Sequence, residues 1–302
     1  MRYTGRRSIT DIVHDNMWAA KVNKPPRFAY RNIQKTRRAF VSWLTRTGEE
    51  EASENFPIKE LMEETILLIT TRGDTSSTTI CATMYCLLHA PDKRARLQKE
   101  VCRAFPSMED IGLDAAMHSC TYLRACADEA LRMAPPAGSV LRREGEAGGS
   151  PSTGRTSPGA PNIGVPVFAI HHDPAYVAEP FAYQPERWIA GETLADGTAV
   201  TPEVAKHAQS AFMPFSAGMR GSIGKPLAYL AISILYATLV HRFDLRLCPD
   251  KWVNWRKSGS GPDPTTEYEL RDIFTSWENG PLVEVCAGIS IPAVRIPGVD
   301  YY

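Results

Sequence analysis

The longest hydrophobic stretch of the chain lies between residues 58 and 90. Its sequence, IKELMEETILLITTRGDTSSTTICATMYCLLHA, has polar ends and an apolar centre, and it contains no proline before Pro91. This length exceeds that of an ordinary surface helix and is typical of a helix that passes through the core of a domain. The pattern therefore predicts one long buried helix that ends before Pro91.

Proline placement and hydrophobic periodicity predict further helices over residues 91–105, 121–134 and 226–240. The first begins with Pro91 in its first turn and Asp92 near its positive end, which are both favourable positions. The second is ended by the proline pair that starts at Pro135. The third has apolar residues at helical spacing from Leu227 to Leu239. We therefore expect a mainly helical fold.

Strands are expected in three places. Residues 165–171, VPVFAIH, are apolar and aromatic, which favours a strand. Residues 241–247 and 275–285 resemble closing strands, the latter around an Asn-Gly turn. Between the helices and these strands lies an insert, residues 144–164, that is rich in glycine, serine and proline. Its composition predicts a flexible loop without a core of its own, which would damage the local sheet.

Composition excludes several functions. The 302 residues are enough for one or two domains, and 34 basic residues balance 34 acidic ones, so no basic footprint for nucleic acid is present. The seven cysteines are odd in number and form no C-x-x-C motif, so reduced, core-filling thiols in a cytoplasmic protein are expected. The N-terminus is polar, and residues 226–240 are too few to cross a bilayer, so no membrane span is predicted.

The richest local signal is a glycine-punctuated segment, residues 212–224 (FMPFSAGMRGSIG), here called the glycine loop. Gly218, Gly221 and Gly224 each permit a positive φ or a close backbone approach. Because the loop leads into a helix, we expect it to present backbone N–H groups to something flat or charged.

Within this loop, Phe215, Gly218, Arg220 and Gly224 stand in the register Phe-x-x-Gly-x-Arg-x-Cys-x-Gly. The loop thus resembles the haem loop of the cytochrome P450 family. Ser222 occupies the position of the family's cysteine. In the family that cysteine is the axial thiolate of the haem iron, whose electron donation favours O–O cleavage. A serine hydroxyl is a neutral and hard donor instead.

A second motif lies in the long helix. Residues 71–76, TRGDTS, resemble the family's Ala-Gly-x-Asp-Thr-Thr segment, in which the acid and the threonine relay protons. The resemblance implies this catalytic role for Asp74 and Thr75. Arg72 departs from the pattern, because a bulky permanent cation takes up space or attracts an anion there. The alternative is that Asp74, Thr75 and Ser76 bond to the preceding turn and bend the helix.

Two more motifs are structural. Glu129 and Arg132 are three residues apart on a helix and share one face. They resemble the family's Glu-x-x-Arg pair, which locks onto the arginine of a later Pro-Glu-Arg segment. Residues 185–188, PERW, are that segment, so the resemblance implies an interlocked network of Glu129, Arg132 and Arg187.

The resemblance implies a mainly α fold with a small β component, equivalent to the C-terminal, haem-proximal part of a truncated cytochrome P450. Its expected organisation is an N-terminal helical or linker segment over residues 1–55, with a helix near 33–45; a P450-like domain over 56–285 that contains the insert; and an extension over 286–302. The N-terminal half of the family fold is expected to be absent.

The function implied is that of a haem-dependent monooxygenase of a small lipophilic secondary metabolite, supplied with electrons by an NADPH-cytochrome reductase. Ser222 takes the axial metal position, with Phe215, Gly218 and Gly224 shaping the loop. Arg220 and Arg143 are the expected partners of the haem propionates.

Two alternatives remain open at the level of sequence. A haem-free pocket lined by Arg72, Asp74 and His171 is suited to isomerisation or cyclisation by acid–base chemistry. The other alternative is a catalytically inactive remnant. Both follow from the missing thiolate and the missing half.

Overall fold

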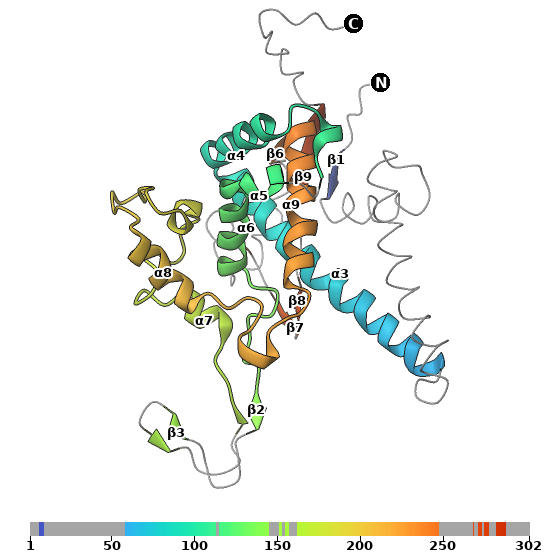
Figure 1. Cartoon of the computed structure of the whole chain (residues 1–302), viewed down its shortest axis with the longest axis vertical. Coiled ribbons are helices and arrows are strands. Elements are labelled where there is room, and N and C mark those ends of the chain that lie inside the picture. Colours follow the sequence, from blue (N-terminus) through green and yellow to red (C-terminus); the bar gives the residue numbers. More distant parts are fainter. Residues whose placement is uncertain are drawn as a thin grey trace, which may run out of the picture.

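The computed structural model describes the chain in segments. These are residues 6–8, 58–112, 115–144, 151–152, 155–156, 162–247, 268, 271–273, 275–277 and 282–287. Side chains are described for 73–112, 115–144, 162–247, 268 and 283–284. Figure 1 shows a group of helices with a small sheet at one end; the helix Pro202–Ala211 lies to the left of this group, and the strand Arg143–Glu144 lies below it.

Helices dominate the described part of the chain, as the sequence predicts. They are α3 (Ile58–His89), α4 (Pro91–Ala104), α5 (Ala115–Ser119), α6 (Thr121–Met133), α7 (Val167–His171), α8 (Pro202–Ala211) and α9 (Lys225–Arg242), with 3-10 turns η1 (Met108–Asp110), η2 (Pro185–Trp188) and η3 (Gly218–Arg220). The expected long helix and the helices that follow Pro91, Cys120 and Gly224 are all present.

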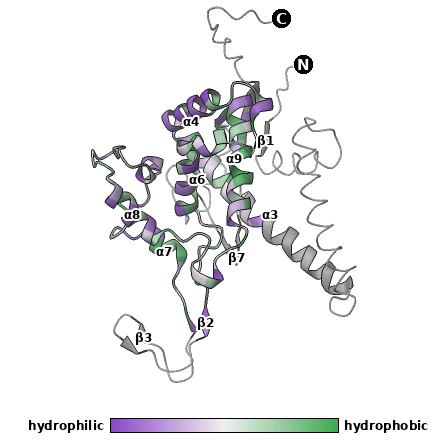
Figure 2. Cartoon of the chain, viewed as in Figure 1, coloured by the Kyte–Doolittle hydropathy of each residue, from purple (hydrophilic) through white to green (hydrophobic). Residues whose placement is uncertain are grey.

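The core forms where α3, α4, α6 and α9 meet. Met84 of α3, Leu97 of α4, Cys126 of α6 and Ile232 of α9 are at most 1% exposed. Tyr236 of α9 is also fully buried, and its hydroxyl donates to the carbonyl of Ile80 on α3. Figure 2 shows that α4 is mostly hydrophilic on its visible surface, whereas hydrophobic colour recurs along α9, in line with its central place.

A small sheet closes one end of the bundle. Strand β9 (Leu282–Ala287) lies between β6 (Phe243–Leu247) and β1 (Arg6–Ser8) and is antiparallel to both. Strand β6 follows α9 directly, and the carbonyl of Leu245 in it accepts a hydrogen bond from Arg94 of α4. The sheet is therefore fastened to the helical core by a side chain as well as by the chain itself.

The expected hairpin around the Asn-Gly turn does not form in the described strands. Strand β8 (Thr275–Trp277) pairs with β7 (Arg271–Ile273), whereas β9 pairs with β6 and β1. Residues 278–281 lie outside the described residues, as does the helix expected near residues 33–45. The domain boundaries at residues 55 and 285 stay predictions.

The strand expected over residues 165–171 is wrong, because Val167–His171 form α7 instead. Val167 and His171 are buried, while Ala169, midway between them, is exposed. A strand would bury all three, because it turns alternate residues to the same face, whereas a helix turns residues three or four apart to one face. Among the described residues, the one strand-like contact of the segment is an isolated bridge between Val140 and Pro166.

The insert holds more strand than expected. Two antiparallel pairs lie at its base and within it: β2 (Arg143–Glu144) with β5 (Asn162–Ile163), and β3 (Pro151–Ser152) with β4 (Arg155–Thr156). The four residues of β2 and β5 are all exposed, so a pairing exists at the base without a core around it. No helix within the described segments is long and apolar enough to cross a membrane.

Candidate functional site

A buried cluster of charges joins α6 to η2. Arg132 donates to Glu129 twice, from Nε to Oε2 (3.0 Å) and from Nη2 to Oε1 (2.9 Å), one helical turn away. Arg187 of η2 donates from Nε to the same Oε1 (2.9 Å). The three side chains are 0%, 1% and 3% exposed in chain order. The structure thus brings together the three residues that the sequence places in a structural network.

The remaining polar atoms of this cluster also have partners. Glu129 accepts from the indole of Trp188 (3.0 Å) and from the backbone N–H of Gln184 (3.0 Å). Both arginines donate to main-chain carbonyls in the segment 171–182, which wraps around them. Burial by itself raises the pKa of Glu129, but the two guanidinium groups outweigh it and lower the pKa to about 2. The carboxylate is therefore ionised at neutral pH.

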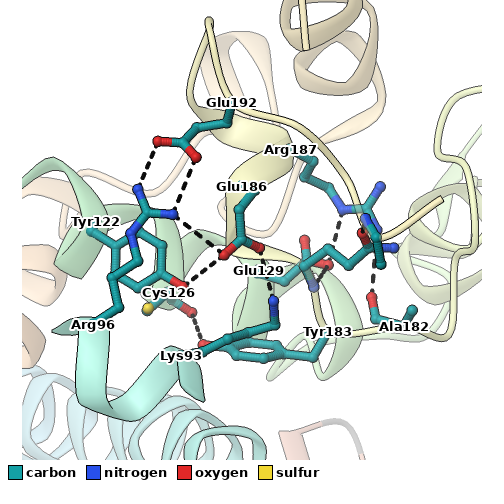
Figure 3. Close-up of polar contacts among 12 residues, drawn as sticks. Lys93, Arg96, Tyr122, Cys126, Glu129, Ala182, Tyr183, Glu186, Arg187 and Glu192 are labelled. Atoms are coloured by element: carbon teal, nitrogen blue, oxygen red, sulfur yellow. Dashed lines mark hydrogen bonds and ion pairs between the residues drawn. The ribbon is translucent and has the colours of Figure 1, made fainter. Parts of the chain in front are cut away.

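A second charged cluster lies beside the first (Figure 3). Glu186 of η2 accepts from Tyr122 of α6 (Oη to Oε1, 2.8 Å) and from Lys93 of α4 (Nζ to Oε2, 3.1 Å). Arg96 of α4 lies 3.6 Å from Glu186 and also forms a two-bonded pair with Glu192 (2.6 and 3.1 Å). This second cluster was not predicted from the sequence.

The two clusters have one consequence in common. Of the consecutive residues Glu186 and Arg187, the glutamate contacts both α4 and α6, and the arginine contacts α6. The short η2 therefore holds these helices in one relative position. One signal was available in the sequence, since Lys93 and Arg96 are three residues apart and must share a face of α4.

Two of the three glycines in the glycine loop stand where a glycine is required, as the sequence predicts. Gly218 has a φ of 64°, and a Cβ at Gly221 would meet the carbonyl oxygen of Gly218 at 3.2 Å. A Cβ at Gly224 would meet only ordinary van der Waals contacts. Ser216 also adopts a positive φ, 62°, which is uncommon for a serine.

Three N–H groups of the loop bond within the loop itself, so these three are not available to a ligand. The amides of Ser216, Gly221 and Ser222 donate to carbonyls of Met213, Gly218 and Phe215 at 3.0, 3.0 and 2.9 Å. The expectation that the loop presents N–H groups to a ligand stays a prediction for its other amides. Ser222 is exposed between Met219 and Ile223, two apolar side chains that have almost no protein cover (103% and 96% exposed).

Aromatic and charged contacts lie beneath the loop. The ring of Phe215 lies 5.2 Å from the ring of Tyr229 in α9, measured between centroids. Tyr229 donates its hydroxyl to Asp128 of α6 (2.5 Å), and the guanidinium of Arg124 both pairs with Asp128 (2.9 Å) and stacks on the Tyr229 ring (3.4 Å). Burial raises the pKa of Asp128. These contacts attach the loop to α6.

The start of the loop is attached separately. The ring of Phe212 lies between those of His171 and Trp188, with centroids 5.6 and 4.7 Å away. His171 is 1% exposed, and both its ring nitrogens have partners: the carbonyl of Arg132 and the N–H of Met213. His171 is thus part of the scaffold, and it is not available for the haem-free acid–base pocket that the sequence allowed.

The predicted proton-relay residues lie in the middle of α3. Asp74 is exposed and Thr75 is half-buried, and no described atom lies within 4 Å of a Cβ built at Gly73. Ser77 and Thr78 donate to the Asp74 carbonyl (2.9 and 3.0 Å), so bonds to the preceding turn do occur in this part of the helix. The side chain of Arg72 lies outside the described residues, and its role stays a prediction.

The two arginines predicted at the haem propionates are both exposed. Arg220 ends η3 in the glycine loop, and no ion pair of its side chain occurs within the described segments. Arg143 lies in β2, where its Nη1 donates to the neighbouring carbonyl of Arg142 (3.1 Å). Within the described segments, no contact links Arg220 to Arg143.

No ready-made metal site is visible in the part of the chain that the structure describes, since no three His, Cys, Asp or Glu side chains converge there. The five described cysteines are reduced thiols outside the glycine loop: Cys81, Cys86, Cys102, Cys120 and Cys126. Burial raises the pKa of the Cys86 and Cys126 thiols above any physiological value, so they are core residues without thiolate character.

Comparison with known proteins identifies what this arrangement is similar to. The family model described as cytochrome P450 matches residues 8–261. Three relatives are named as cytochrome P450 monooxygenases: lcsN of Purpureocillium lilacinum, 36% identical over 248 residues; apf8 of Gibberella fujikuroi, 36% over 243; and poxM of Penicillium oxalicum, 35% over 280.

The matches cover most of this chain and less of the relatives. They include 82%, 80% and 93% of the chain, and 71%, 64% and 49% of the three relatives respectively. The chain thus spans between about half and about seven tenths of the length of these proteins.

Proposed function

The chain belongs to the cytochrome P450 family, and from that premise we propose that it is a P450-type oxidoreductase of secondary metabolism whose glycine loop offers the haem iron an oxygen donor, Ser222, in place of sulfur. The proposed substrate is a small lipophilic metabolite, and the proposed electron donor is an NADPH-cytochrome reductase.

The single observation that carries this proposal is the outer surface of the glycine loop. Met219 and Ile223, which precede and follow Ser222 in the chain, expose apolar side chains, and Arg220 adds an exposed cation. Uncovered apolar surface of this kind is suited to the face of a flat apolar ligand, and the cation is suited to a carboxylate at its rim. The residues therefore fit a porphyrin, although they do not fit a thiolate-ligated iron.

When bound, the haem supplies the oxygen chemistry of the family. The chain's own residues have more limited proposed roles. Phe215, Gly218 and Gly224 set the shape of the loop, and Arg220 with Arg143 binds the propionates. The carboxyl of Asp74 and the hydroxyl of Thr75 hold and pass on protons within α3, next to the space left by Gly73.

The serine has a predictable effect on the iron. Its hydroxyl is uncharged at neutral pH, and a hard neutral oxygen is a weaker ligand than a thiolate. We expect weak haem binding, and monooxygenation far below that of relatives that carry cysteine, because the electron donation of the thiolate is missing.

The test is optical. The purified protein is mixed with haem, reduced and exposed to carbon monoxide, and its Soret band is compared with those of Ser222→Cys and Ser222→Ala. The proposal expects haem uptake by all three proteins and a thiolate-type band in Ser222→Cys alone. A thiolate-type band in the unchanged protein would refute the role of Ser222.

Failure of all three proteins to take up haem would favour the other functions considered, a haem-free isomerase or cyclase and an inactive remnant. The first of these is weakened by His171, because both its ring nitrogens are already bonded within the protein. Asp74, which is exposed, and Arg72 remain for such a pocket. Loss of turnover in Asp74→Ala would separate that enzyme from a remnant.

A further inference from the structure

His171, a buried histidine outside the proposed reaction site, lies between the ion-pair cluster and the glycine loop. It ends α7 and is 1% exposed. Its backbone carbonyl accepts a hydrogen bond from Nη1 of Arg132 (3.0 Å). The cluster therefore holds the backbone of His171 in place. Its side chain then bridges two segments that are far apart in the sequence.

The bonds of the imidazole define its tautomer. Nε2 lies 3.0 Å from the backbone nitrogen of Met213, which can only donate, so Nε2 carries no proton. Nδ1 lies 3.1 Å from the carbonyl oxygen of Arg132, which can only accept, so Nδ1 carries the proton. The ring is therefore neutral, and each nitrogen has one specific task.

The bond to Met213 continues into the turn of the glycine loop. The carbonyl of Met213 accepts from the N–H of Ser216, the residue with a φ of 62°. The adjacent Phe215 accepts from the N–H of Ser222 through its own carbonyl (2.9 Å). A displacement of Met213 would therefore shift the residues that determine where the Ser222 hydroxyl lies.

A parallel contact supports the same connection. Phe212 packs between His171 and Trp188, and the Trp188 indole donates to Glu129 at the centre of the cluster. Phe212 thus contacts both His171 and Trp188, Met213 contacts His171, and both of these groups bond to residues of the cluster.

We infer that His171 is a positioning residue: through Nε2 it holds Met213, and so transmits the geometry of the Glu129–Arg132–Arg187 cluster to the glycine loop. As far as the haem is concerned, this inference rests on the proposed function. The holding of the loop itself does not, because every contact in the connection is between residues of the chain.

Two variants separate the two nitrogens. In His171→Gln, the side-chain oxygen reaches the position of Nε2 and can still accept from Met213, but the bond to Arg132 is lost. In His171→Asn, the shorter amide reaches the position of Nδ1 and can still donate to the Arg132 carbonyl, but the bond to Met213 is lost. Each variant loses one buried hydrogen bond, so both should lose similar global stability.

A matched control is the neighbouring His172. It is also buried, but its Nδ1 bonds to the carbonyl of Phe168 within α7, and among the described residues it forms no hydrogen bond to the loop. His172→Asn should therefore leave the loop unchanged.

Amide hydrogen exchange of the haem-free full-length proteins measures the effect. In His171→Asn, exchange in residues 213–222 should accelerate about tenfold, the factor that corresponds to one ordinary buried hydrogen bond. In His171→Gln and His172→Asn the exchange of these residues, compared with that of α6, should stay near that of the unchanged protein, because α6 reports the loss of global stability that both His171 variants share. Equal acceleration in the asparagine and glutamine variants, or none in either, would overturn the inference.

Haem titration of the same proteins keeps the two proposals apart. If the loop responds as expected and no protein takes up haem, the positioning role stands and the proposed function fails. If haem binds, His171→Asn should bind it about tenfold more weakly than His171→Gln, and equal binding would contradict the link to Ser222.

If both variants fail to fold, nitrogen NMR of the histidines in the unchanged protein decides the question. A protonated Nδ1 and an unprotonated Nε2 at His171 are required. The opposite tautomer would exclude the bond to Met213 and overturn the inference.

Discussion

Replacing Glu129 by glutamine removes the negative charge that two buried arginines share. The glutamine is the same size, so packing is kept. One of its two terminal atoms, however, is an NH₂ group that faces donors, because both carboxylate oxygens of Glu129 accept from Arg132. The variant leaves Arg132 and Arg187 charged and buried, without the counter-charge that made their burial tolerable.

Two estimates of the loss agree. Removal of one member of a buried ion pair costs about 3–5 kcal/mol. The lowering of the Glu129 pKa from 4.5 to about 2 corresponds to about 3 kcal/mol between the ionised and neutral forms. Since a domain is typically stable by about 5–15 kcal/mol, the change removes a large part of the total.

The assay is urea unfolding of the haem-free protein. With an m-value of about 3 kcal/mol per M, the midpoint should fall by about 1 M or more. The matched control is Glu192→Gln, whose pair with Arg96 is just as short (2.6 Å) but has side chains 30% and 41% exposed. An exposed pair contributes less than about 1 kcal/mol. Similar losses in the two variants would refute the argument that burial makes the Glu129 cluster strong.

Three further predictions follow from single residues. Burial lowers the pKa of His171 from 6.5 to about 4. The neutral ring therefore contributes about 3 kcal/mol to the free energy of unfolding above pH 6.5, and this contribution is lost as the pH falls toward 4. His171→Gln should flatten that part of the curve of stability against pH. Tyr229→Phe, which leaves Asp128 without its hydroxyl donor, should lose about 1–3 kcal/mol in urea unfolding, and a loss below about 0.5 would contradict the role of that bond. In Gly164→Ala the new Cβ would meet a main-chain oxygen at 2.9 Å, so the variant should be less stable by about 1–3 kcal/mol. In Gly73→Ala the new Cβ meets no described atom and lies in a helix, so the variant should be more stable by up to about 1 kcal/mol. The reverse order of stabilities would contradict the space assigned to the two glycines.

The helices were predictable because their signals are local. Pro91 and Pro135 mark where helices begin and end, and the apolar spacing after Gly224 predicts α9. The contact between Glu129 and Arg132 follows from their spacing of three residues. Arg187 was added to that pair by family resemblance alone, since nothing local connects residues 58 positions apart.

The features that could not be predicted depend on contacts between distant parts of the chain or on ambiguous local signals. The bond between Tyr229 and Asp128 spans 101 residues, and that between Lys93 and Glu186 spans 93. His171 is one of two adjacent histidines, and only the fold selects which of them contacts the loop. The run VFAIH is too short for periodicity to separate a strand from a helix, and only the exposure of Ala169 between the buried Val167 and His171 separates them.

The pairing of β1 with β9 has a consequence for the order of folding. Residues 6–8 can meet residues 282–284 only by closing a loop that contains almost the whole chain. Closing such a loop requires a large loss of chain entropy, while the turns that join α3 to α4 and α9 to β6 require very little. We therefore expect the helices to assemble first and β1 to join last. On warming, this edge strand should also be the first to detach, while α6 and its charged cluster are still intact.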